Sequence, residues 1–253
     1  MYDLEKEKQI ISILRNKQFD NIANLANALY VSESTLRRML VKMEQKGIIT
    51  RTYGGVYLKS ESETEHLSVE LREKQNLVEK KALVKKAIEF IEDDTAIFID
   101  SSTTCLQIAP LLNDFKNLTI ITNGLNLAYE LMLKTQHKIM VVGGNIQFHT
   151  NSIVGSLAEK MMSDVHVSLA IFSTSEMDAE FGFSEKSAEQ ASFKNLMVHN
   201  AARSLYLVDD SKIDHKSLFK TCDLKDVSII VTKKSLDKRY FQAAPKTLFV
   251  HCD

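Results

Sequence analysis

Six mostly apolar runs after residue 75 constrain the fold more than any other feature of this chain. Each run is four or five residues long, and stretches long enough for a helix separate most of them. Strands that are apolar on both faces are typical of a parallel sheet covered by helices on its two sides. The sequence therefore predicts a mostly parallel, open α/β domain at residues 75–253. The runs are residues 96–99, 118–121, 138–142, 169–172, 204–208 and 227–231.

The first sixty residues lack such runs and follow a helical pattern instead. Asp20 or Asn21 can cap a second helix, and Ser32 can cap a third helix that Gly47 stops. Three helices followed by a small hairpin form a winged helix-turn-helix. We therefore expect a small N-terminal winged helix-turn-helix at residues 3–58 and a linker at 59–74. The expected helices are residues 4–14, 22–29 and 32–46, and the hairpin strands are residues 48–51 and 56–58.

The third predicted helix has the two faces that a DNA-reading helix needs. Leu36, Met39, Leu40 and Met43 recur at the spacing of one buried stripe. Arginine and hydroxyl side chains on the other side can reach base edges and phosphates. A three-helix bundle with a solvated charged face is the alternative. The residues expected to contact DNA are Ser32, Ser34, Thr35, Arg37, Arg38 and Lys42 of the helix, and Arg51, Tyr53, Gly54 and Gly55 of the wing.

Charge is distributed unevenly along the chain. The net charge is −1, but residues 1–60 hold ten Lys and Arg residues against six Asp and Glu residues. A basic head that meets phosphate fits this asymmetry, and chance is the alternative. The cysteine and histidine spacings match no metal site, so no metal or cofactor is expected. Without a signal peptide or a membrane-length apolar segment, we expect a cytoplasmic protein with no membrane partner.

Two segments of the first sixty residues closely resemble the head of the DeoR family of bacterial regulators. They are Val31 to Arg38 and Gly47 to Val56, where the family shows V-S-x-x-T-[IV]-R-R-D and G-x-[LI]-x-R-x-H-G-G-A. Met39 replaces the acidic residue of the family pattern, and Tyr53 replaces its histidine. Met39 lies on the apolar stripe and can pack there, which leaves the operator preference open.

Polar clusters follow four of the predicted strands, where ligands bind in open α/β sheets. The segment from Asp100 to Thr104 opens a predicted helix whose amides and dipole favour phosphate, and simple capping is the alternative. Asn123 can equally be a plain N-cap. The pair Gly143 and Gly144 can simply form a tight turn, and Lys212 can be an ordinary solvated lysine. The candidate effector-binding residues are Asp100, Ser101, Ser102, Thr103, Thr104, Asn123, Gly143, Gly144, Asp209 and Lys212.

These later segments also resemble the DeoR sensor domain, which is similar in fold to ribose phosphate isomerases. The resemblance covers nearly the whole chain. The family often has arginine at the position of Gln147, and glutamate at the position of Ser192 before the lysine matched by Lys194. These two departures leave open an altered effector, weaker phosphate binding or a different ligand contact.

The resemblance implies a transcriptional repressor of genes for sugars or related metabolites, released from double-stranded operator DNA by a phosphorylated sugar-type effector. Symmetric half-sites imply a homodimer or homotetramer. An isomerase of phosphorylated sugars is the alternative from another class, with Asp100 or Asp209 as its base. A DNA-binding head is superfluous in such an enzyme, so we expect no catalytic residue. A purely protein-binding role is the third hypothesis, and it predicts no salt-dependent DNA affinity.

Overall fold

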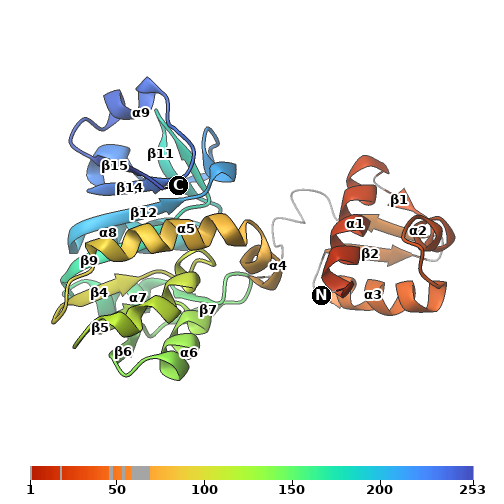
Figure 1. The fold of residues 1–253 in the computed structure, drawn as a ribbon, viewed down its shortest axis with the longest axis horizontal. Helices are drawn as coiled ribbons and strands as arrows, with labels where there is room; N and C mark the ends of the chain where they lie inside the picture. Colours follow the sequence, from red (N-terminus) through yellow and green to blue (C-terminus); the bar gives the residue numbers. More distant parts are fainter. Residues whose placement is uncertain (1, 18, 46–47, 53–54, 59–68, 253) are drawn as a thin grey trace. The chain divides into compact units, whose positions relative to one another are not determined.

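The computed structural model describes residues 2–17, 19–45, 48–52, 55–58 and 69–252 (Figure 1). The chain divides into two compact units, Met1–Arg72 and Glu73–Asp253, which are called the N-terminal and the C-terminal unit below. Several positions with an expected role lie outside the described residues. These are Lys46, Gly47, Tyr53, Gly54 and residues 59–68 of the expected linker.

The N-terminal unit is the predicted winged helix-turn-helix. Asn21 caps the second helix, because its side chain accepts a hydrogen bond from the Asn24 amide at 2.8 Å. Ser32 caps the third through the Thr35 amide at 3.2 Å. A short strand before the second helix was not predicted, and it joins the wing hairpin in an antiparallel sheet of order β1-β3-β2. The elements are α1 (Tyr2–Lys17), β1 (Phe19–Asp20), α2 (Ile22–Ala28), α3 (Glu33–Gln45), β2 (Ile49–Thr52) and β3 (Gly55–Leu58).

The apolar stripe of α3 forms the centre of this unit. Its four members are buried, and they join a cluster that includes Ile10 and Leu14 of α1 and Leu25 of α2. Met39 is 4% exposed, so the residue that departs from the family pattern packs in the core. The stripe fixes which side of α3 remains available to a partner.

The C-terminal unit is built on the predicted parallel sheet, in the order β15-β14-β12-β9-β4-β5-β6 (Figure 1). Each of the six apolar runs lies on one strand, and only the edge strand β15 was missed. The chain reverses its direction of winding between β4 and β9, which pair in parallel with Ile97 opposite Leu169. The strands are β4 (Ala96–Ile99), β5 (Thr119–Thr122), β6 (Lys138–Val141), β9 (Val167–Ser173), β12 (Ala201–Val208), β14 (Ile229–Thr232) and β15 (Leu248–His251).

Helices cover both faces of this sheet, as the doubly apolar strands require. Residues of α5, η2 and α6 share one core with one face, and residues of α7, α8 and α9 share a second core with the other. The boundary between the two units falls within α4 (Val69–Lys74). The helices that lie wholly in the C-terminal unit are α5 (Leu77–Ala87), η1 (Ile88–Phe90), η2 (Cys105–Asp114), α6 (Leu125–Lys134), α7 (Ser156–Met162), α8 (Ala188–His199), η3 (Asp210–Lys212), η4 (Leu224–Asp226) and α9 (Lys238–Ala243).

Two small antiparallel sheets complete the C-terminal unit. One pairs β7 with β8, and the other has the order β10-β11-β13. Neither was predicted, because polar residues interrupt their short strands and leave no continuous apolar run. The bounds are β7 (Asn145–Gln147), β8 (Ser152–Val154), β10 (Glu176–Asp178), β11 (Gly182–Glu185) and β13 (Phe219–Cys222).

Two local expectations about helix starts need correction. The helix after Asp100 is a 3-10 helix, η2, that begins at Cys105 and contains Pro110, whose ring nitrogen has no hydrogen to donate. The next helix, α6, begins at Leu125 with Gly124 as its N-cap, so the alternative of Asn123 as a plain N-cap is wrong.

The described part of the chain contains no helix both long and apolar enough to cross a membrane. Over the same residues, no three metal-ligating side chains gather into a possible metal site. Cys105, Cys222 and Cys252 are buried and unpaired. Burial raises the pKa of all three thiols, that of Cys222 to about 12, so they remain protonated at neutral pH.

Candidate functional site

The outer side of α3 carries two adjacent arginines in different situations. Arg37 is exposed and forms an ion pair with Glu33, one turn earlier, at 3.3 Å. Arg38 is also exposed, and it forms no hydrogen bond or ion pair with any residue that the structure describes. A guanidinium without a partner keeps all five donors for a ligand. Ser32 and Ser34 lie at the start of the same helix, with their hydroxyl oxygens 3.0 Å apart.

An ion pair between Arg51 and Glu44 joins the wing to α3. The Arg51 guanidinium nitrogen Nε donates to Glu44 at 2.7 Å, and the Arg51 amide donates to the same carboxylate at 3.0 Å. Gly55 is needed at the start of β3, because a side chain there would meet the Asp20 carbonyl and the Phe19 ring. Arg51 therefore holds β2 against the end of α3, in addition to any contact that it makes with a phosphate.

A second polar site lies in the C-terminal unit where the sheet reverses its winding. In open α/β sheets this point forms the ligand crevice. Asp100 follows β4, and its carboxylate accepts from the Ser173 amide at the end of β9 at 3.1 Å and from the Ser102 amide at 2.9 Å. Asp100 is only 1% exposed. The carboxylate thus joins the two strands on either side of the reversal.

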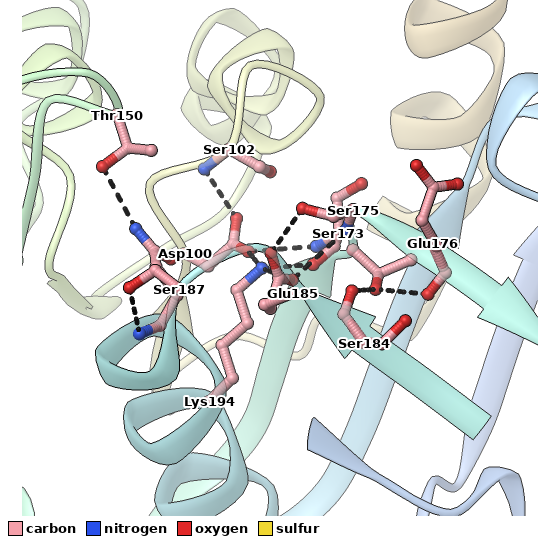
Figure 2. A network of polar contacts seen from close by, with 12 residues as sticks. Asp100, Ser102, Thr150, Ser173, Ser175, Glu176, Ser184, Glu185, Ser187 and Lys194 are labelled. Atoms are coloured by element: carbon pink, nitrogen blue, oxygen red, sulfur yellow. Dashed lines mark hydrogen bonds and ion pairs between the residues drawn. The ribbon is translucent and has the colours of Figure 1, made fainter. Parts of the chain in front are cut away.

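The ammonium of Lys194 on α8 is the cation at the centre of this site (Figure 2). It lies 2.6 Å from Glu185 of β11 and 3.2 Å from Asp100, and it donates to the Ser173 carbonyl at 2.6 Å. Burial lowers the pKa of Lys194, but the charges of Glu185 and Asp100 outweigh burial and raise it above its ordinary value. The site therefore holds one permanent cation between two carboxylates.

A loop after β9 extends the acidic side of the site. The Ser175 hydroxyl donates to Glu185 at 2.7 Å. Beside it, Glu176 Oε2 is buried and accepts no hydrogen bond from the described residues. Burial raises the pKa of Glu176. This part of the site can bind donors, such as hydroxyl groups or ammonium groups.

The start of α5 contacts two of the loops that carry candidate residues. Lys80, which is buried, donates to the Thr103 hydroxyl at 3.0 Å. Asn76 donates to Asp209 at 3.3 Å, and the Asp210 amide donates to Glu79 at 2.6 Å. The first turn of α5 is therefore bound to the loop after β4 and to the loop after β12.

The predicted effector residues do not all come together. Asp100 to Thr104 and Asn123 follow neighbouring strands, and Gly124 packs so closely on Ser101 that a Cβ would lie 2.8 Å from its Cα. Gly143 follows β6, whereas Asp209 follows β12, four strand positions away. At about 4.8 Å per strand, these two positions are about 19 Å apart, too far for one small ligand.

Sequence reasoning missed the central residues of the site. Lys194 was noted only as the match of a family lysine, and Glu185 was not noted at all. Ser192, the expected site of a missing glutamate, is exposed, and the buried carboxylate beside Lys194 comes from Glu185 instead. Gln147, the other departure, lies in a hydrogen-bonded network with Gln190 of α8.

Comparison with known proteins finds one family for both units. Residues 6–62 match the DeoR-like helix-turn-helix domain, and residues 75–234 match the DeoR C terminal sensor domain. The chain is 30% identical to the uncharacterized HTH-type transcriptional regulator YulB of Bacillus subtilis, over 92% of this chain and 90% of that protein. It is 25% identical to the lactose phosphotransferase system repressor of Staphylococcus epidermidis, over 94% and 96%.

Among solved structures, ribose 5-phosphate isomerase A of Methanocaldococcus jannaschii aligns with 55% of each chain at a TM-score of 0.41 and 14% identity.

Proposed function

Because the chain belongs to the DeoR family of transcriptional regulators, we propose that it represses genes for sugars or related metabolites and leaves its operator when a phosphorylated sugar-type effector binds. Its family and its relatives are DNA-binding transcriptional regulators, so the chain is a DNA-binding regulator and not an enzyme. The staphylococcal relative is named as the repressor of a lactose phosphotransferase system, which supports an effector of the sugar type.

The single observation that carries the DNA-binding proposal is the unpartnered guanidinium of Arg38 on the exposed side of α3. An arginine in this position can donate two hydrogen bonds to guanine. Arg37, already paired with Glu33, is better suited to a phosphate contact. The proposed interface also includes the remaining predicted residues: Ser32, Ser34, Thr35, Lys42, Arg51, Tyr53, Gly54 and Gly55.

The proposed seat of the phosphoryl group is the loop between β4 and η2. The amides of Ser101 and Thr104 donate no hydrogen bond to any described residue. Such amides before a helix bind anions well. The sugar hydroxyls would then face Asp100 and Asn123, and Lys212 would add a positive charge from η3.

The contacts of α5 support a route from the effector to the operator. A ligand held by the loop after β4 changes the surroundings of Thr103, which is hydrogen-bonded to Lys80. The first turn of α5 follows directly on the segment that leads from the N-terminal unit. Effector binding can therefore alter the spacing or order of the DNA-binding units, with a coupling of about 1–3 kcal/mol.

The alternative of a sugar-phosphate isomerase finds no support in the two expected base residues. Asp100 is held by Lys194 and by two backbone amides. Asp209 accepts from Ser211 and Asn76. These bonds stabilise the ionised form of each carboxylate, which makes it a weaker base for taking a proton from a sugar carbon.

The proposed organisation is a winged helix-turn-helix at residues 3–58, a linker at 59–74 and an effector-sensing domain at 75–253. The two family matches, at residues 6–62 and 75–234, support these boundaries. We further propose a cytoplasmic homodimer or homotetramer, because two half-sites on the operator need at least two N-terminal units.

Operator binding tests the proposal directly. DNA from upstream of the gene and its neighbours is titrated with the full chain at two salt concentrations, with and without a panel of sugar phosphates. Tight, salt-sensitive binding that one compound releases is the expected result. A folded protein that binds no fragment at low salt would overturn the DNA-binding proposal, and binding that no compound changes would overturn the effector proposal.

A further inference from the structure

Five uncharged polar side chains form a network beside Lys194. Gln190 donates to Gln147 at 3.0 Å, to Thr150 at 3.1 Å and to Ser152 at 2.7 Å, and Gln147 donates to Ser187 at 3.1 Å. Ser152 is fully buried, and Gln190 is 6% exposed. These five residues are called the amide network below.

The amide network adjoins the site at the reversal of the sheet. Gln190 lies one helical turn before Lys194 on α8, and both side chains are buried, so they share the inward face of that helix. Figure 2 shows Thr150 and Ser187 in one group with Asp100 and Lys194. The network therefore forms one wall of the candidate effector site.

One buried carbonyl oxygen at this wall has no donor within the described residues. Asn123 is 2% exposed, and its Oδ1 is buried without a hydrogen bond. Its amide group is oriented by a bond from Nδ2 to the Ile153 carbonyl at 3.1 Å, next to Ser152. The amide nitrogen of Gln190 lies within hydrogen-bond distance of Ser152, which precedes Ile153 in the chain. Buried acceptors without a donor are unfavourable, and a ligand can supply the missing donors.

The charges of the site determine which ligand group suits this wall. The nearby cation, Lys194, is shared by Glu185 and Asp100, which leaves an excess of one negative charge among the three. A phosphoryl group brings further negative charge and only acceptor oxygens at neutral pH. A hydroxyl group is neutral and can donate to a carbonyl oxygen.

We propose that the amide network, with Asn123, is the subsite for the uncharged, hydroxyl-bearing end of the effector, and that it excludes a second phosphoryl group. This inference rests on the proposed function, which places the single phosphoryl group at the loop of Ser101 and Thr104. Gln147 and Gln190 are then the residues that set the specificity for a monophosphate.

Calorimetric titration of the full chain with matched ligand pairs tests this proposal. The pairs are fructose 6-phosphate with fructose 1,6-bisphosphate, glucose 6-phosphate with glucose 1,6-bisphosphate, and ribulose 5-phosphate with ribulose 1,5-bisphosphate. The parent sugars are titrated as well. A monophosphate should bind at least about tenfold more tightly than its bisphosphate, since placing like charges together costs more than about 1.4 kcal/mol.

Variants locate the effect in the amide network. Gln147→Arg adds a cation to the wall. It should reduce the ratio of the bisphosphate dissociation constant to the monophosphate dissociation constant at least about fivefold. Gln242→Arg, the same change on the exposed face of α9, is the matched control and should leave the preference unchanged. Gln190→Leu removes the hydrogen bonds from Gln190 to Gln147, Thr150 and Ser152 and should weaken monophosphate binding.

Two of the outcomes separate the inference from the proposed phosphorylated effector. A bisphosphate that binds the wild-type chain as tightly as its monophosphate overturns the inference and leaves the function standing. Binding of a parent sugar alone supports the subsite and overturns the phosphorylated effector. If none of these compounds binds, both are rejected. The titrations of the wild-type chain test the proposed preference for a monophosphate even if a variant does not fold.

Discussion

Replacing Lys194 with methionine should strongly destabilise the C-terminal unit. Methionine has a similar length but no charge, so Lys194→Met leaves Asp100 and Glu185 buried without their cation. Removal of one partner from a buried ion pair lowers stability by about 3–5 kcal/mol, because the remaining charge is uncompensated. Here two carboxylates lose their cation, and the Ser173 carbonyl loses a donor at 2.6 Å. We expect a loss of about 3–5 kcal/mol in the free energy of unfolding at pH 7.

Urea unfolding followed by circular dichroism measures this loss. The double variant Lys194→Met/Glu185→Gln should recover part of the loss at pH 7, since one of the two unpaired charges is gone.

Lys160→Met, on the exposed side of α7, is the matched control and should change the free energy of unfolding by less than about 0.5 kcal/mol. A loss below about 1 kcal/mol for Lys194→Met would refute the assignment of a buried ion pair at this position.

Three further predictions concern DNA, coupling and pH. Arg38→Ala should weaken operator binding by about 1–3 kcal/mol. Arg37→Ala removes the same charge and should weaken it less. Equal losses of operator affinity in anisotropy titrations of the two variants would contradict base recognition by Arg38. Lys80→Met should leave the separate affinities for operator and effector intact but reduce the change in operator affinity that the effector causes. If the effector changes operator affinity as much in this variant as in the wild-type chain, the coupling route through Thr103 and Lys80 is excluded. Burial raises the pKa of Glu176, so its contribution to stability is present at low pH and is lost as the pH rises. Glu176→Gln should therefore raise the free energy of unfolding at pH 8 more than at pH 4, and an equal effect at both would contradict this.

The parallel sheet could be predicted because its central strands are apolar along their whole length. The edge strand β15 escaped, since Leu248 and His251 at its ends are exposed and give no continuous apolar run. The 3-10 form of η2 was also missed. The same apolar spacing suits either helix, and the signal that distinguishes them here is Pro110 in the middle of the segment.

The candidate site was only half predictable. Asp100 and Asn123 follow apolar strands, which is a local signal that the sequence displays directly. Lys194 gives no such signal, because a lysine on a helix ordinarily lies on the solvent side. Its burial depends on Glu185, whose strand β11 belongs to a small separate sheet, and on Asp100, which lies far away in the sequence. Contacts of this kind follow from the tertiary fold alone.

The pairing of β4 with β9 also orders events during synthesis of the chain. Among the described residues, the core of the N-terminal unit uses only positions between Ile10 and Val56, so this unit can fold as soon as it leaves the ribosome. The site at the reversal needs β9, β11 and Lys194, which appear roughly 10–30 s later at usual translation rates. A newly made chain can therefore complete its N-terminal fold before the site that we propose for the effector has formed.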